Sequence, residues 1–168
     1  MVSTSEGRVE IRVGDLLEAN VDYIAHQCNC VTVGQGAGIA RSIFAKYPDA
    51  NTYTRNSIRV CGEIYATRRV INMYAQHYPG RYMASMTGDN EENRLKWFKE
   101  CLNQIGIYLS HRRDKIHSQA PFIVGFPYMI GCGLAGGEWE YYFDAIEDFA
   151  ANFSQVVKVV IYKLPSTD

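Results

Sequence analysis

Apolar positions in the first part of the chain follow strand patterns. Residues Arg8 to Val13 alternate between polar and apolar, which predicts a half-exposed strand. Val21 to Cys28 is a mostly apolar run that ends in a polar cluster, as the buried strands of parallel sheets do. Further strands are expected over Gly62 to Thr67 and Arg69 to Tyr74.

Between the second and the third of these predicted strands, the apolar residues have the spacing of a helix. Ile39, Ile43 and Tyr47 recur at intervals of a helical turn, and Pro48 is expected to end that helix. A second short helix is expected over Asp49 to Ile58. The chain therefore alternates between strand and helix from its beginning.

The clearest helical pattern starts near Asp89. Asp89 and Glu92 have the spacing of a capping box, with Asp in place of the usual Ser or Thr. Apolar residues then recur at intervals of three and four, namely Leu95, Phe98, Leu102, Ile105 and Leu109. The basic run Arg112-Arg113-Asp114-Lys115 is expected to be a solvated loop after this helix.

The remainder of the chain repeats the order of strand, loop and helix. An apolar run over Phe122 to Ile130 precedes a glycine-rich loop, a helix over Glu138 to Ala151 and a last strand over Val156 to Tyr162. The helix face expected to be buried carries Trp139, Phe143, Ile146 and Ala150. The alternation predicts one α/β layered domain with a mixed sheet over residues 1–168.

Composition and charge narrow the classes of function. The chain has 168 residues, of which 47% are hydrophobic, and a chain of this size can build a core without disulfides or metals. Seventeen basic and eighteen acidic residues give a formal net charge of -1. This balance argues against a nucleic-acid binder that relies on bulk positive charge, but it permits a nucleotide held by backbone amides.

The N-terminus and the cysteines indicate a reducing compartment. Met1 to Glu10 is polar and lacks the apolar core of a signal peptide, and no apolar run approaches the length that spans a bilayer. We therefore expect a protein of the cytosol or nucleus, with no membrane partner. The cysteines are odd in number and without a repeating spacing: Cys28, Cys30, Cys61, Cys101 and Cys132.

A metal site is not expected from these residues. A zinc set could in principle combine two cysteines and two histidines, Cys28, Cys30, His26 and His77. Their spacing fits no common zinc pattern. We expect neither a metal nor another cofactor.

Two glycine-rich loops each stand between an apolar strand and a helix. They are Gly34-Gln35-Gly36-Ala37-Gly38 and Gly131-Cys132-Gly133-Leu134-Ala135-Gly136-Gly137. Glycine lets the backbone approach a ligand closely, and a helix N-terminus favours an anion. Either loop alone could be only a tight turn. Two of them, at the carboxyl ends of strands, favour a site that grips a diphosphate.

The usual nucleotide-binding motifs do not fit. Residues 131–136 match G-x-G-x-x-G, but a Rossmann unit needs an acidic residue about twenty positions further on, at the end of the next strand. That strand ends at Tyr162 without one. No G-x-x-x-x-G-K-[ST] is present, which excludes a P-loop NTPase. Glu138 and Glu140 would oppose a highly charged phosphate chain, so a diphosphate held by amides fits better.

At these residues the chain resembles the macro domain family, a three-layer α/β/α fold with a mixed, mostly parallel central sheet that binds ADP-ribose. Gly14-Asp15 followed by Leu16 resembles the family's Gly-Asp-[Ile/Leu], whose aspartate accepts a hydrogen bond from the adenine amino group. Residues 25–30 and 36–40 resemble the strand and loop that hold the distal ribose, and the resemblance covers nearly the whole chain.

The resemblance implies roles for single residues. Asn29 falls on the ribose-contacting asparagine, residues 131–137 on the phosphate loop, and Tyr162 on an aromatic that packs against adenine. The ligand-binding residues implied in this way are Asp15, Leu16, Gly36, Ala37, Gly38, Ile39, Gly131, Cys132, Gly133, Leu134, Ala135, Gly136 and Tyr162. Asp15 and Asn29 could instead be turn residues, and Tyr162 could be core.

Within the family the chain looks most similar to the branch of the yeast ADP-ribose-1''-phosphate phosphatase and the terminal ADP-ribose glycohydrolase. That glycohydrolase uses a lysine after a central strand and an aspartate in the phosphate loop, where this chain has Gln76 or His77, and Ala135. A larger branch of hydrolases has an aspartate in the first glycine loop, where this chain has Gln35 and Ala37.

The candidate catalytic residues are therefore Asn29, His26 and His77. His26 lies in the middle of an apolar strand and could be a core residue, although the yeast phosphatase has histidine at the matching position. His77 follows a strand and could act as a general base, because histidine titrates near neutral pH. It could equally be a solvated loop residue. Cys132 is expected to have some thiolate tendency at a helix N-terminus.

Two functions remain open at this point. The first is hydrolysis of an ADP-ribose derivative, either ADP-ribose-1''-phosphate or a target carrying ADP-ribose. The second is a reader that binds ADP-ribose without turnover. The expected partners are ADP-ribose or an ADP-ribosyl derivative, including an ADP-ribosylated protein or nucleic acid, and the chain is expected to be a monomer.

Overall fold

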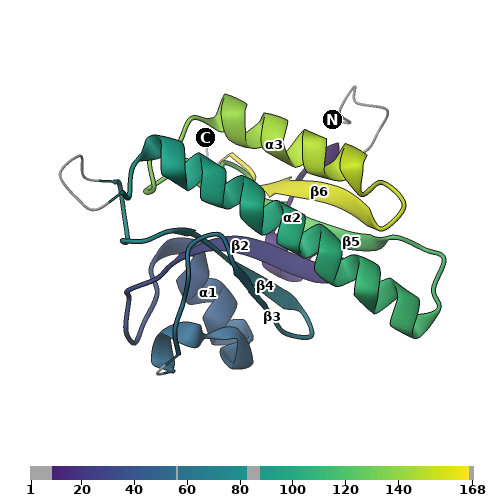
Figure 1. Cartoon of the computed structure of the whole chain (residues 1–168), viewed down its shortest axis with the longest axis horizontal. Coiled ribbons are helices and arrows are strands. Elements are labelled where there is room, and N and C mark those ends of the chain that lie inside the picture. The colour runs from purple at the N-terminus through teal and green to yellow at the C-terminus, as the bar shows by residue number, and fades with distance from the viewer. Residues whose placement is uncertain (1–8, 56, 83–87, 167–168) are drawn as a thin grey trace.

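The computed structural model describes residues 9–55, 57–82 and 88–166, and a six-stranded sheet forms its centre (Figure 1). The strands are β1 (Val9–Val13), β2 (Tyr23–Asn29), β3 (Ile64–Ala66), β4 (Val70–Gln76), β5 (Phe122–Pro127) and β6 (Val157–Lys163). They lie in the order β1-β6-β5-β2-β4-β3. Each neighbouring pair is parallel except β3 and β4, which are antiparallel.

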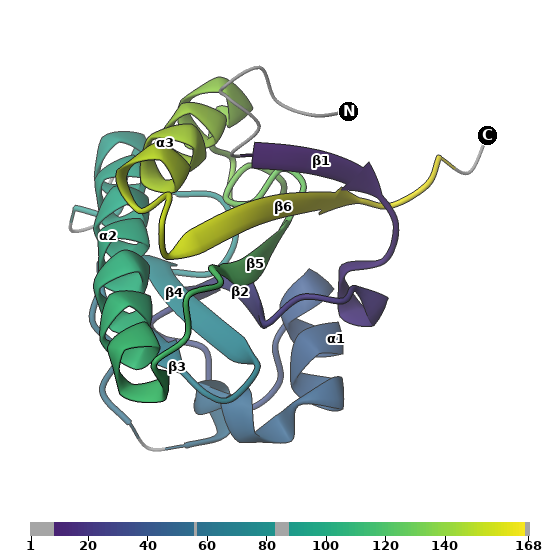
Figure 2. The same ribbon diagram turned by 90° about the vertical axis from the view of Figure 1, so that its right-hand side faces the viewer.

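Helices cover both faces of this sheet. Helices α2 (Glu91–Ile116) and α3 (Trp139–Asn152) lie side by side on one face, and α1 (Gly38–Lys46) lies on the other (Figures 1 and 2). The apolar side chains accordingly form two clusters, one that includes Ile105 of α2 and one that includes Ile43 of α1. The expected three-layer α/β/α architecture with a mixed, mostly parallel sheet is confirmed.

The parallel strands bring their carboxyl ends to the same edge of the sheet. β1, β6, β5, β2 and β4 all run in one direction. The segments that leave these ends therefore gather at that edge, where ligands bind in open α/β sheets. They include the turn after β1 and both glycine-rich loops.

Helix α2 begins differently from its prediction. Its first residue is Glu91, and its N-cap is Asn90, whose Oδ1 accepts a hydrogen bond from the backbone N–H of Asn93 at 2.8 Å. Asp89 is not the cap. It is buried beneath the helix start, where it forms an ion pair with Arg94.

Two other segments also depart from their predictions. Helix α2 continues to Ile116, so the basic run over residues 112–115 is helical rather than a loop. The Arg112 and Arg113 side chains anchor these last turns, because they donate to the Tyr23 hydroxyl at 3.1 Å and to the Ser118 carbonyl at 3.0 Å. Residues 49–58, expected as a helix, contain instead the end of one 3₁₀ turn and the whole of another, Pro48–Ala50 and Thr52–Thr54.

The buried face of α3 is rotated from the predicted one. Ile146 and Ala150 are buried as expected, but Trp139 and Phe143 are only partly buried. The centre of the face is formed by Tyr142, Ala145 and Phe149. Among the described residues, no helix combines the length and the apolarity needed to cross a membrane.

Candidate functional site

A cleft of about 910 Å³ opens at the carboxyl ends of the parallel strands. Its walls come from the turn after β1, the ends of β2, β4 and β6, and the loops that lead into α1 and α3. A cavity of this size can hold a small organic ligand. Of the predicted ligand-binding residues, the following line it: Asp15, Leu16, Gly36, Ala37, Gly38, Ile39, Gly131, Cys132, Gly133, Leu134, Ala135 and Tyr162. Gly136 lies outside the lining, beside the Arg81 side chain.

One end of the cleft lies between the ends of β1 and β6. The backbone N–H of Gly14 donates to the Lys163 carbonyl at 2.9 Å, which brings the two strand ends together. The Tyr162 ring therefore lies over Gly14, 3.6 Å from the place where a Cβ would stand. Asp15 caps the following turn through Oδ1, which accepts from the Leu17 N–H at 3.0 Å. An exposed carboxylate and a half-buried aromatic ring thus face the same end of the cleft.

The opposite end is built around Asn29, the last residue of β2. Its Oδ1 accepts hydrogen bonds from the N–H groups of Val31 at 3.0 Å and Thr32 at 2.8 Å. The Tyr53 hydroxyl accepts from the Asn29 N–H at 3.0 Å. Asn29 therefore has the turn role that its position suggested. Within the described residues nothing accepts from its Nδ2, which leaves that donor for a ligand.

The loop into α1 presents the unpaired start of a helix to the cleft. Ala37 is the N-cap and has no side-chain capping bond. Gly38 follows with a φ of 57°, a conformation that glycine adopts without strain. The first N–H groups of an α-helix have no partner within the helix, so the amides of residues 38–40 are available to an acceptor in the cleft.

The loop after β5 carries a second row of unpaired amides. Its turn is closed by bonds from Gly136 N–H to the Gly133 carbonyl, at 3.2 Å, and from Gly137 N–H to the Gly131 carbonyl, at 3.0 Å. In the described part of the chain, no acceptor faces the N–H groups of Gly133, Leu134 and Ala135. These residues line the cleft, so they form a nest of donors for an anion.

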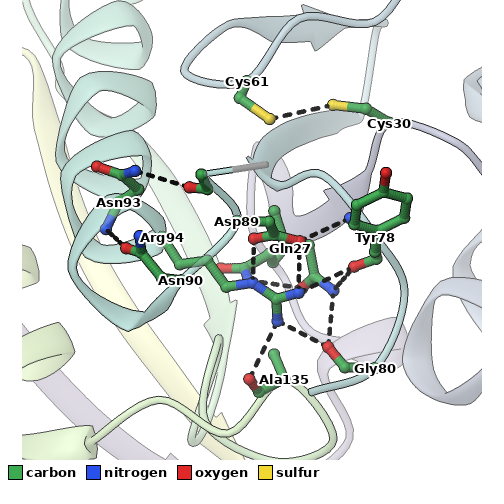
Figure 3. Close-up of polar contacts among 12 residues, drawn as sticks. Gln27, Cys30, Cys61, Tyr78, Gly80, Asp89, Asn90, Asn93, Arg94 and Ala135 are labelled. Carbon is green, nitrogen blue, oxygen red and sulfur yellow. Dashed lines mark hydrogen bonds and ion pairs between the residues drawn. The ribbon is translucent and has the colours of Figure 1, made fainter. Parts of the chain in front are cut away.

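Arg94 holds this second loop through a hydrogen bond to the Ala135 carbonyl (Figure 3). Its guanidinium is buried and bidentate on Asp89, with Nε at 2.6 Å from Oδ1 and Nη2 at 2.8 Å from Oδ2. The remaining hydrogens go to carbonyl oxygens, those of Tyr78 at 3.2 Å, Gly80 at 2.7 Å and Ala135 at 3.1 Å. Burial alone would raise the pKa of Asp89, but the bonds from Arg94 and from the Tyr78 N–H hold that pKa below its usual value.

A pair of glutamines, which sequence reasoning did not single out together, crosses the floor of the cleft. Gln27 Nε2 donates to Gln76 Oε1 at 2.7 Å, and Gln76 Nε2 donates to the Tyr78 carbonyl at 2.8 Å. Gln27 Oε1 is buried and has no partner among the described residues. Polar side chains near the ends of two adjacent apolar strands were the available signal. Tyr53 and Tyr128 also line the cleft and had no such signal.

His26 is not a cleft residue, which corrects its place among the candidate catalytic residues. Its side chain is fully buried under α1, with Nε2 2.7 Å from Asn72 Oδ1 and its ring against Phe44. The period of two along β2 puts it on the same face as Ile24 and Cys28, away from Gln27. Burial lowers the pKa of His26 to about 4, although its bond with Asn72 opposes that shift.

His77 and Cys132 also differ from their expected roles. His77 does not line the cleft, and its ring packs edge-on against Tyr78 at 4.5 Å, near the thiols of Cys30 and Cys61. Cys132 lines the cleft, but burial raises the pKa of its thiol to about 12, which is the opposite of a thiolate tendency. Cys132 also lies seven residues before Trp139, the first residue of α3, whereas the helix dipole acts only near the first turn.

The four residues considered as a zinc set do not come together, because His26 and Cys28 lie under α1. The structure instead gathers Cys30, Cys61 and His77, whose ligand atoms all lie within 4.8 Å of one another.

Comparison with known proteins identifies the fold. No protein-family model and no curated protein matches the sequence. Among solved structures, the macrodomain of Mycobacterium tuberculosis DarG is 19% identical, with a TM-score of 0.67 over 94% of this chain and 98% of that chain. The macrodomain of Thermus aquaticus DarG is also 19% identical, with a TM-score of 0.64 over 92% of this chain and 97% of that chain. A Trypanosoma brucei macrodomain in complex with ADP-ribose is 13% identical, with a TM-score of 0.62 over 94% of this chain and 64% of that chain. The chain therefore has the macrodomain fold.

Proposed function

We propose that this protein binds ADP-ribose in the cleft at the carboxyl ends of its parallel strands. The observation that carries the proposal is the pair of unpaired amide rows, residues 38–40 and 133–135, that line one cavity. A diphosphate carries two separated negative groups and matches such donors without a basic side chain. Structural neighbours in complex with ADP-ribose and with ADP support this choice of ligand.

The two ends of the cleft suggest how the ligand is oriented. Asp15 and Tyr162 would take the adenine, because a carboxylate can accept from the exocyclic amine while an aromatic ring covers the base. The Nδ2 of Asn29 and the Oε1 of Gln27 would bond the hydroxyls of the distal ribose. The resemblance to macro domains implies the same roles for Asp15, Tyr162 and Asn29, and the contact from Gln27 is added from its place in the cleft.

Binding without turnover is the function that the geometry supports best. Among the described lining residues the charged side chains are Asp15, at the proposed adenine end, and Lys163 beside it. Neither His26 nor His77 lines the cleft, so the bases suggested by the sequence are out of reach of a substrate there. A reader needs only the amides and the polar ends that the cleft offers.

Hydrolysis of an ADP-ribose derivative is the second candidate. The observation in its favour is that Asn29, with an unpaired Nδ2, and Gln27, with an Oε1 that has no partner among the described residues, both line the cleft, where such a donor and acceptor could hold an attacking water. ADP-ribose-1''-phosphate is the substrate that resemblance to the phosphatase branch suggests. A protein or nucleic acid carrying ADP-ribose is the other.

Titration calorimetry with ADP-ribose, and with AMP and NAD as controls, tests the binding proposal. Tight binding of ADP-ribose and much weaker binding of both controls is expected. Absence of binding by ADP-ribose contradicts the proposal. Long incubation with ADP-ribose-1''-phosphate and with an ADP-ribosylated protein then separates the two candidates, because a reader releases neither phosphate nor ADP-ribose.

A further inference from the structure

Three side chains that can ligate a metal converge outside the cleft. Cys30 follows the last residue of β2, His77 follows the last residue of β4, and Cys61 lies in the turn before β3. The two sulfurs are 3.5 Å apart (Figure 3), and the ligand atoms of all three residues lie within 4.8 Å of one another. None of the three lines the cleft. Each of them is half-buried, so a small ion can reach the cluster from solvent.

We propose that Cys30, Cys61 and His77 bind one zinc ion. Two thiolates and an imidazole are the ligands that zinc prefers. In a tetrahedral site with zinc–sulfur bonds of about 2.3 Å, the two sulfurs stand about 3.8 Å apart. The observed separation of 3.5 Å is close to this value, so the thiols need only a small adjustment.

The backbone already holds the ligands in place. Asn29 and Gln76, the neighbours of Cys30 and His77, pair with each other in the β2–β4 register. The Cys30 N–H donates to the His77 carbonyl at 3.0 Å, which fixes the two strand ends against each other. The third ligand is anchored to the same strand, because the Gly62 N–H donates to the Tyr74 carbonyl at 2.8 Å. A site preformed in this way loses little entropy when the ion binds.

The Arg59 guanidinium places a positive charge near the cluster. Arg59 stays beside the cluster because it donates to the carbonyls of Asn29 at 3.2 Å and Thr32 at 2.7 Å. Zinc binding displaces the proton of each thiol and forms bonds to both sulfurs and to one imidazole nitrogen, and the two protons pass to solvent.

The third ligand distinguishes a metal site from a redox pair. A disulfide would use the two sulfurs and leave the imidazole without a role. The His77 ring is held at the cluster by its edge-on contact with Tyr78, at 4.5 Å and 88°. Three protein ligands leave the fourth tetrahedral position open to water. This inference goes beyond ADP-ribose binding and does not depend on it.

Cobalt titration of the reduced, chelator-treated protein tests the site directly. We expect one cobalt ion per chain, with thiolate-to-cobalt charge-transfer bands, the visible bands of tetrahedral cobalt, and displacement of both by one equivalent of zinc. Cys30→Ser, Cys61→Ser and His77→Ala should each weaken binding by at least about 100-fold, since even residues behind the ligands are worth about 10- to 100-fold. His77→Cys should keep tetrahedral binding, because it substitutes one zinc ligand for another.

Matched controls use residues outside the cluster. Cys132→Ser removes a thiol and His111→Ala removes a histidine, and neither should change the cobalt spectrum or affinity. Circular dichroism of each variant checks that it is folded. A freshly reduced wild-type protein that takes up no cobalt overturns the proposal. So do bands that persist unchanged in folded His77→Ala, because the imidazole would then not be a ligand.

Discussion

Among the polar residues, we expect that replacing Arg94 lowers the free energy of unfolding most. Arg94→Met keeps a long apolar stem but removes the guanidinium, which leaves Asp89 only 1% exposed and without its counter-ion. It also frees the carbonyl oxygens of Tyr78, Gly80 and Ala135, to which the guanidinium donates. The change therefore leaves a buried carboxylate without its counter-ion. It also removes the hydrogen bond that holds the loop over residues 131–137.

The expected loss of unfolding free energy follows from the burial of the ion pair between Arg94 and Asp89. Removing one partner of a buried ion pair costs about 3–5 kcal/mol, whereas an exposed pair is worth about 0–1 kcal/mol. Asp89 keeps its bond from the Tyr78 N–H at 2.9 Å, so we expect the lower part of that range, about 3 kcal/mol. Against a total stability of about 5–15 kcal/mol, this is a large fraction.

Urea unfolding followed by tryptophan fluorescence measures this loss. The variant should be destabilised most near neutral pH and less in acid. In the wild type the lowered pKa of Asp89 contributes stability above the unfolded pKa, and that contribution is lost as the pH falls through the folded pKa. In the variant the unpaired Asp89 becomes neutral in acid, so its burial then costs less. The double variant Asp89→Asn/Arg94→Met should recover much of the loss. A destabilisation by Arg94→Met below about 1 kcal/mol would refute the reasoning, since that is the value of a surface pair.

Three further outcomes are expected. Gly133→Glu should abolish ADP-ribose binding with little change in melting temperature, because a Cβ at Gly133 meets nothing within 4 Å and its carboxylate would enter the amide nest; unchanged calorimetric affinity would remove the loop from the site. Asp15→Ala should weaken adenosine-containing ligands by about 1.5–3 kcal/mol and leave ribose 5-phosphate unaffected, as expected for a charged hydrogen bond to adenine; equal losses for both would contradict the orientation. Stability should fall by up to about 3 kcal/mol as the pH is lowered from 6.5, the ordinary pKa of histidine, to about 4, because the folded pKa of His26 is depressed and the unfolded chain takes up the proton first. In urea titrations, the stability of His26→Gln should not show this fall between pH 6.5 and 4. If that variant loses as much stability over this range as the wild type, other groups cause the loss.

Much of the fold follows from local pattern. The runs that predicted strands correspond to β1 to β6 within a few residues, because period-two and continuous apolar patterns report directly on sheet faces. The two glycine-rich loops were also recognisable, since strand, glycine and helix in succession imply an open helix N-terminus at a strand end. The resemblance then indicated a ligand, and the cleft gathers most of the residues that it implied. Compartment and oligomeric state stay predictions from the sequence.

Local pattern failed where a side chain had a choice of partners. The spacing of Asp89 and Glu92 predicted a capping box, but Asn90 caps α2 and Asp89 turns inward to Arg94. Nothing in the sequence distinguishes an acidic cap from a buried acid five residues before an arginine. His26 presents the same difficulty, because an apolar strand buried on both faces does not show which of its faces meets the cleft.

The sequence by itself determined the order of strands and helices and the place of two glycine-rich loops at strand ends, from which a diphosphate ligand is predicted. These properties depend on residues that are close in the chain, where periodicity and glycine act directly. Only the tertiary structure decided that Gln27 lies against Gln76, that Arg94 donates to the loop over residues 131–137, and that Cys30, Cys61 and His77 form one cluster. Each of these groups joins segments that are far apart in the sequence, and the strand order β5-β2-β4, which no local pattern encodes, is what brings them together.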